Sequence, residues 1–157
     1  MGKKSEKYSI SKIDIFLGDL KGFKYPQYTI QINDISLNDY LNLHTKSSDF
    51  DLLLPPIAMF NNEDQQKAIH LIDFRNVTMP LLICSDDMDF FCTIVSAYVV
   101  EHDDIVLWKY FGYGLEISTS IHVPALAFDK IGYAAFINKF KTFALENYGA
   151  SSIGRPS

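Results

Sequence analysis

Long apolar runs, arginine and cysteine are all scarce in this sequence. No apolar run reaches the roughly 18–20 residues that a membrane-spanning helix needs. The lysine-rich N-terminus is not followed by the apolar segment of a secretory signal, so we expect a cytoplasmic protein without a membrane partner. The composition, 48% apolar and 21% charged, is that of an ordinary globular domain and excludes collagen-like and disordered chains.

Cysteine occurs only at positions 84 and 92. With no export signal in view, we expect Cys84 and Cys92 to be reduced, buried thiols. A hairpin could still bring them together, and their oxidation would require a compartment that the sequence does not indicate.

The motifs of the common enzyme classes are missing as well. The sequence contains no glycine-rich phosphate loop, no G-x-S-x-G elbow, no H-E-x-x-H and no paired C-x-x-C. The four histidines are spread too widely to suggest joint metal ligation, although a pair such as Cys84 with His70 remains open because catalytic partners need only meet in space. We therefore expect a protein that is not an enzyme and binds no cofactor.

Charge is distributed unevenly along the chain. Residues 1–25 and 130–157 each carry a net charge of +3, whereas residues 26–129 carry −11, from four basic and fifteen acidic residues. Such a surface repels nucleic acid and accelerates association with a basic partner. The sequence has only two arginines, the usual phosphate-binding side chain, so we expect no nucleic-acid partner.

One acidic group, formed by Asp86, Asp87 and Asp89, has oxygen ligands at alternating positions, as Ca²⁺ or Mg²⁺ would need. The glycine and distal glutamate of an EF-hand loop are missing. Three interpretations stay open, namely a structural turn, a partner-binding patch and a metal site, and we expect no metal.

Hydrophobic periodicity predicts an α+β fold, a mostly antiparallel sheet with helices packed on a face. Strands are expected near residues 10–17, 28–32, 79–84, 91–100, 105–113 and 117–123. Helices are expected at 36–43, from a cap at Asn62, and from a cap at Asp129 to a stop at Gly149. The last of these is amphipathic, with an aromatic stripe facing the core. Residues 1–148 would form a single domain and residues 149–157 a flexible tail.

Residues 80–95 and 105–112 together resemble the strand, acidic turn and hairpin of small bacterial immunity proteins from contact-dependent growth inhibition and related polymorphic toxin systems. Residues 128–140, with Tyr133 and Phe136, resemble the closing helix of such proteins. The resemblance implies a cytoplasmic, non-catalytic protein. It would bind the C-terminal toxin domain of its own system and block the active site or substrate groove.

Taken with the charge pattern, the resemblance predicts a toxin-binding surface made of two acidic groups. They comprise Asp86, Asp87, Asp89, Glu101, Asp103 and Asp104. We expect Cys84, Cys92, Trp108 and Phe136 to be structural. The alternatives are a general protein-interaction or adaptor domain, dimeric through an exposed sheet edge, and a small divalent-metal-binding domain. The oligomeric state stays open.

Overall fold

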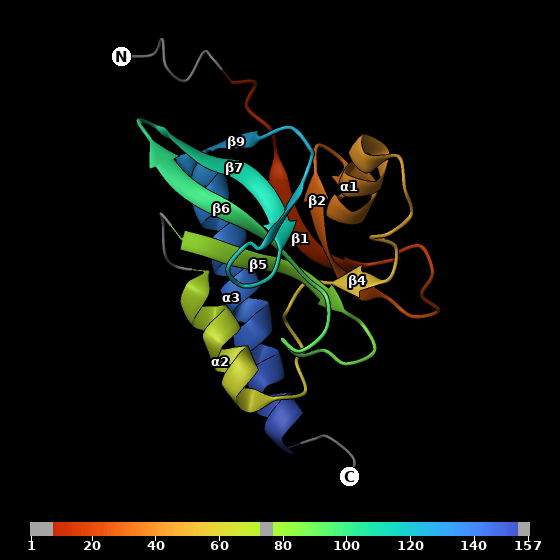
Figure 1. The fold of residues 1–157 in the computed structure, drawn as a ribbon. Coiled ribbons are helices and arrows are strands. Elements are labelled where there is room, and N and C mark those ends of the chain that lie inside the picture. Colours follow the sequence, from red (N-terminus) through yellow and green to blue (C-terminus); the bar gives the residue numbers. More distant parts are fainter. Residues whose placement is uncertain (1–7, 73–76, 154–157) are drawn as a thin grey trace.

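The computed structural model describes residues 8–72 and 77–153 and confirms the α+β class (Figure 1). Three helices accompany two antiparallel sheets in these ranges. The helices are α1 (Leu37–Thr45), α2 (Asn62–Leu71) and α3 (Lys130–Ile153). The smaller sheet contains β1 (Ile13–Gly18), β2 (Gln27–Ile32) and β3 (Ile35–Ser36). The larger contains β4 (Leu53–Leu54), β5 (Val77–Cys84), β6 (Ile94–His102), β7 (Ile105–Tyr113), β8 (Thr119–Ile121) and β9 (Leu126–Asp129).

The larger sheet is built around the β6–β7 hairpin, which the sequence predicts. Its strands follow the order β4-β5-β6-β7-β8. Strand β9 pairs with the first part of β7, from Ile105 to Trp108, whereas β8 pairs with the end of β7, from Phe111 to Tyr113. Pro80 sits at an irregularity in the β5–β6 register, as expected for a residue that lacks an N–H to donate. The sixth strand starts at Ile94 rather than at Phe91, so the prediction of a strand from residue 91 is wrong at its start.

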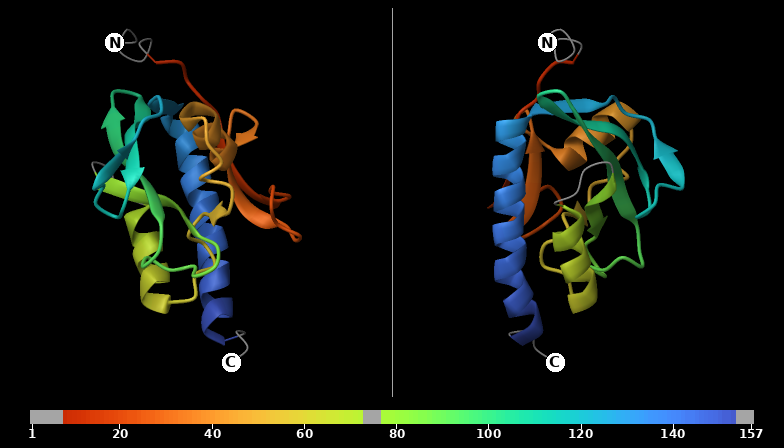
Figure 2. Two further views of the ribbon diagram at one scale, coloured as in Figure 1. Left: turned by 45° about the vertical axis from the view of Figure 1, so that its right-hand side comes forward. Right: turned by 90° about the vertical axis from the view of Figure 1, so that its left-hand side faces the viewer.

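Helix α3 runs along the length of the molecule and contacts α2 and strands β1, β7 and β9 (Figure 2). Asp129 caps it, because its Oδ1 accepts a 2.6 Å hydrogen bond from the Gly132 N–H. Of its predicted stripe, Tyr133, Phe136, Ile137, Phe140 and Ala144 are buried and Phe143 is half-buried. The side chain of Tyr148, the last predicted residue of the stripe, lies outside the described part of the structure. The predicted stop at Gly149 is wrong, since the helix continues to Ile153, and the last part of the predicted tail, 154–157, lies outside the described residues.

An aromatic cluster fixes α3 to the larger sheet. Trp108 is fully buried on β7, and its Nε1 donates a 3.1 Å hydrogen bond to the Tyr133 hydroxyl. The ring of Phe136 packs edge-on against the same indole. Trp108 and Phe136 are therefore structural, as predicted.

Polar side chains fix the shorter helices. Ser36 caps α1 through a 3.0 Å hydrogen bond from the Asp39 N–H, as the sequence predicts. The cap of α2 is Asn61, one residue before the predicted Asn62. Gln65 of α2 is buried and donates to the Ala144 carbonyl of α3 over 2.9 Å. Within the described ranges, no helix has both the length and the apolar character that crossing a bilayer requires.

Candidate protein-binding surface

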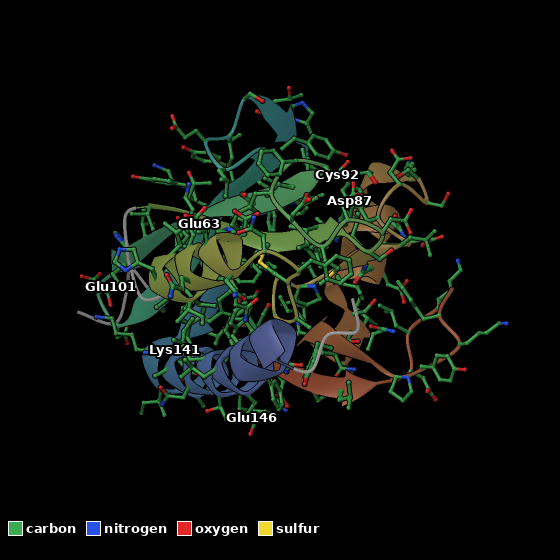
Figure 3. The ribbon with its side chains drawn as sticks, turned by 90° about the horizontal axis from the view of Figure 1, so that it is seen from below. Glu63, Asp87, Cys92, Glu101, Lys141 and Glu146 are labelled. Atoms are coloured by element: carbon green, nitrogen blue, oxygen red, sulfur yellow. A yellow bond between two sulfur atoms is a disulfide. The ribbon has the colours of Figure 1, made fainter. Side chains whose placement is uncertain are left out.

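The β5–β6 connection, residues 85–93, forms what we call the acidic loop, and a disulfide closes it. Cys84 at the end of β5 is bonded to Cys92, with their Cα atoms 6.0 Å apart. The prediction of reduced, buried thiols is therefore wrong. The disulfide forms because the tight turn after β5 brings the Cα atoms of the two cysteines to a separation that a disulfide can bridge. Cys92, which is labelled in Figure 3, is also exposed rather than buried.

Contacts with α2 hold the acidic loop in place independently of the disulfide. Met88 is buried, and its carbonyl accepts a 3.1 Å hydrogen bond from the Phe60 N–H. Asp64, in the first turn of α2, accepts a 3.1 Å hydrogen bond from the Phe90 N–H. The first half of the loop is thus tied to the N-terminal end of α2.

Phe91 is a large apolar side chain of the acidic loop that is exposed to solvent, with 86% of its surface accessible. Asp89 Oδ1 accepts a 2.9 Å hydrogen bond from the Phe91 N–H, and the next residue is the bonded Cys92. The backbone of this aromatic residue is therefore held on both sides. The sequence pattern misses Phe91 as a surface residue, since the apolar alternation from 91 to 100 places it inside a strand.

The three predicted aspartates belong to the same loop as Phe91, but they differ in what they do. Asp89 is half-buried and supports the turn through its bond to Phe91. Asp86 and Asp87 are exposed, and within the described residues their side chains make no hydrogen bond or ion pair. Asp86 and Asp87 are therefore available to a partner.

The second predicted acidic group lies at the other end of β6. Glu101 lies near the end of β6, and Asp103 and Asp104 form the β6–β7 turn, where Asp103 adopts a left-handed conformation with φ 55°. The nine residues of β6 separate the two groups by about 26 Å at about 3.3 Å per residue step. Figure 3 accordingly shows Glu101 and Asp87 on opposite sides of the molecule. The structure thus divides the predicted surface into two patches.

The turn at the far end of β6 has fewer features that favour binding. Glu101 lies 4.0 Å from the Lys130 ammonium, and both side chains are about half exposed. An exposed pair of this kind contributes little to stability, yet it neutralises part of the local charge. Residues 101–104 are Glu, His, Asp and Asp, so this end of the hairpin has no apolar side chain to serve as an anchor.

A groove adjoins the acidic loop. The sequence pattern gave no indication of it. Two neighbouring pockets share Asp49 and Tyr113 in their walls, and one of them reaches Cys92 and Thr93 of the loop. Burial raises the pKa of the Tyr113 phenol, and the negative charge of Asp49 raises it further. Asp49 and Tyr113 are 64 positions apart in the chain, so no local motif could have revealed them.

An exposed aromatic ring with carboxylates in the same loop is typical of surfaces that bind another protein. Among the residues that the structure describes, no three histidines, cysteines, aspartates or glutamates are grouped so that they could hold a metal ion. The acidic loop and the groove beside it are therefore the candidate site. Comparisons of the chain with protein-family models, curated proteins and solved structures give no match.

Proposed function

We propose that this protein is an immunity protein that binds the C-terminal toxin domain of its own system and neutralises it without catalysis. The observation that carries the proposal is Phe91, 86% exposed in a disulfide-closed loop of three aspartates. Exposure alone would be a weak argument, because Ile131 on α3 is equally exposed. What distinguishes Phe91 is its fixed backbone and the unpaired carboxylates of Asp86 and Asp87 in the same loop.

This combination matches the energetics of tight protein interfaces. A few central residues, often aromatic, supply most of the binding free energy when they enter a pocket of the partner. Charges around such an anchor direct the encounter and select among partners. Because the loop is already ordered by its disulfide and by Asp64, little conformational entropy remains to be lost on binding.

The charge of the surface indicates a basic partner. Asp86 and Asp87 contribute to the net −11 of residues 26–129. A nuclease toxin carries a basic groove for the phosphates of its substrate, and aspartates can occupy such a groove in place of phosphates. The proposed interface therefore consists of Phe91, Asp86, Asp87 and Asp89, with the patch at Glu101, Asp103 and Asp104 as a separate surface.

The cytoplasm remains the proposed compartment, because an immunity protein acts where its toxin acts. Disulfides persist mainly in oxidising compartments, so this proposal requires the loop to function as a dithiol too. The bonds of Met88 and Asp64 do not involve sulfur and would keep residues 85–90 in place after reduction. Alkylation of thiols in intact cells, followed by mass spectrometry, tests which form is present.

A growth assay tests the proposed function. The C-terminal domain encoded by the gene immediately upstream is expressed with its catalytic residues intact, and this protein is expressed from a second plasmid. We expect wild-type protein to restore growth and a Phe91→Ala/Asp86→Asn/Asp87→Asn variant to restore it far less. Growth arrest that persists with abundant, folded wild-type protein would contradict the proposal and favour the adaptor interpretation.

A further inference from the structure

The groove beside the acidic loop consists of two adjoining pockets of ≈ 670 and ≈ 360 Å³. The larger pocket opens at Cys92 and Thr93, and the smaller extends to His122 beyond β8. Asp49 and Tyr113 line both pockets, and therefore stand where the two meet. The described walls contain no lysine or arginine, and their two histidines, His44 and His122, line the smaller pocket only.

Buried and half-buried amides fix the backbone that carries Asp49. The Asn38 amide of α1 donates to the carbonyls of Phe50 and Leu53 over 2.6 and 2.9 Å. Asn42 accepts a 3.0 Å hydrogen bond from the Phe50 N–H. The residue before Phe50 is thus held against α1 while its own side chain stays exposed.

The neighbouring carboxylate, Asp51, has polar partners within the protein, in contrast to Asp49. Asp51 accepts a 2.7 Å hydrogen bond from the Asn42 amide and lies 3.6 Å from the Lys21 ammonium. Asp49 makes no such side-chain contact among the described residues. Of the two acids in this segment, Asp49 is the one that lines the groove and forms no ion pair with a described residue.

An aromatic wall stands beside this charge. The rings of Tyr113 and Phe50 are nearly parallel, with 8° between their planes and 6.3 Å between their centroids. Phe50 is buried in the core, whereas Tyr113 is half-buried and borders the groove. A phenol keeps its proton at neutral pH, and the raised pKa of Tyr113 moves its ionisation further into the alkaline range, so the hydroxyl adds no negative charge.

We propose that this groove binds one arginine side chain of the partner protein, with the Asp49 carboxylate as its counter-ion and the Tyr113 ring as its stacking surface. A planar guanidinium can stack on a tyrosine ring and donate two hydrogen bonds to a carboxylate at the same time. An ammonium offers a point charge without that planar match, so the groove prefers arginine to lysine.

This inference rests on the proposed function for the nature of the partner and specifies its contact chemistry. Since the larger pocket reaches Cys92, which follows Phe91, the groove and the aromatic anchor belong to one continuous surface. The partner therefore presents an arginine beside an apolar pocket that receives Phe91.

The groove can be tested without the partner, by NMR titration of the ¹⁵N-labelled protein with N-acetyl-arginine-N-methylamide. We expect saturable shifts of the amides of Asp49, Gly114, Ser118 and Ser120, and at least threefold weaker binding of the matching lysine compound. Asp49→Asn should weaken arginine binding at least fivefold. Asp34→Asn is the matched control, because it removes an equal, exposed charge that lies outside the groove and outside the acidic loop, and it should leave the affinity unchanged.

Two results would overturn the inference. One is the lack of saturable shifts at the groove, and the other is an equal effect of Asp49→Asn and Asp34→Asn, which would mean general attraction to an acidic surface. Both replaced residues are exposed, so neither variant endangers the fold. Failure of the growth assay with a functional arginine groove would refute the proposed function alone. Rescue by a protein without arginine binding would refute this inference alone.

Discussion

Asp64 accepts a hydrogen bond from the backbone N–H of Phe90 over 3.1 Å, and this bond joins two segments 26 residues apart. The same carboxylate lies in the first turn of α2, where negative charge is favourable. One residue therefore stabilises a helix and positions the loop that carries Phe91. The position of Phe91 therefore depends on α2 as well as on the disulfide.

Replacing Phe91 with alanine should weaken partner binding at least tenfold, because the substitution removes the aromatic anchor of the interface. It should leave the melting temperature unchanged, since 86% of the side chain is exposed. Ile131→Ala is the matched control, because Ile131 is equally exposed but lies on α3. Calorimetric titration and a thermal melt of each variant check the prediction. Equal affinities of the two variants would exclude Phe91 as an anchor.

Neutralising Asp86 and Asp87 together should lower the association rate constant and reduce its dependence on salt, because these charges direct the encounter. The same change at Asp103 and Asp104, about 26 Å away along β6, should have little effect. Stopped-flow kinetics at two salt concentrations separates the two pairs. A larger effect from Asp103 and Asp104 would transfer the interface to the β6–β7 turn.

Loss of the disulfide should destabilise the protein without unfolding it. Opening a closed loop of about nine residues costs about 2.5 kcal/mol in the chain-entropy account. For a chain of this size, that corresponds to a decrease of about 5–10 °C in melting temperature. The Cys84→Ser/Cys92→Ser variant should show this decrease in the absence of any reductant, and dithiothreitol should reproduce it in the wild type.

Hydrogen exchange locates the change within the acidic loop. In the double serine variant, exchange should accelerate at residues 91–93, whereas Phe90 keeps its bond to Asp64 and stays protected. Partner binding should weaken, because Phe91 is no longer held from both sides. Uniform acceleration across β5 and β6 would show that the disulfide supports the whole sheet rather than the anchor.

Stability should decrease above pH 10. Burial raises the pKa of Tyr40, and burial together with Asp49 raises the pKa of Tyr113. In the unfolded chain these phenols ionise near an ordinary pKa of about 10, whereas the folded protein retains their protons longer. The unfolded state then binds fewer protons, so the free energy of unfolding falls as pH rises.

Urea unfolding at pH 8, 10 and 11 measures this decrease. Tyr113→Phe should flatten it, because that variant has no phenol at position 113 to ionise. Asp49→Asn should lower the pKa of Tyr113, since it removes the negative charge beside it. An unchanged pKa in Asp49→Asn would contradict the placement of this carboxylate at the groove.

The elements that the sequence predicted correctly are those that local spacing and capping residues specify. The alternating residues of the β6–β7 hairpin, the Ser36 and Asp129 caps and the buried stripe of α3 follow directly from spacing and capping chemistry. The site depends on contacts between distant residues. Phe91 continues an apolar alternation, and only the turn at Asp89 and the bond at Cys92 remove it from the strand.

The pairing of Asp49 with Tyr113 was still harder to predict from local sequence patterns. Each is an unremarkable residue in its own segment, and they meet because Phe50 packs beneath the Tyr113 ring while Asn38 holds the loop. The acidic residues were recognisable as clusters, but their division between the two ends of β6 follows from strand pairing.

The most direct test of the account is a calorimetric titration of this protein with the catalytically inactivated C-terminal domain encoded immediately upstream, at physiological salt. The account predicts a one-to-one complex of nanomolar or tighter affinity, weakened at least tenfold by Phe91→Ala and unchanged by Ile131→Ala. No detectable binding by a folded domain would contradict it.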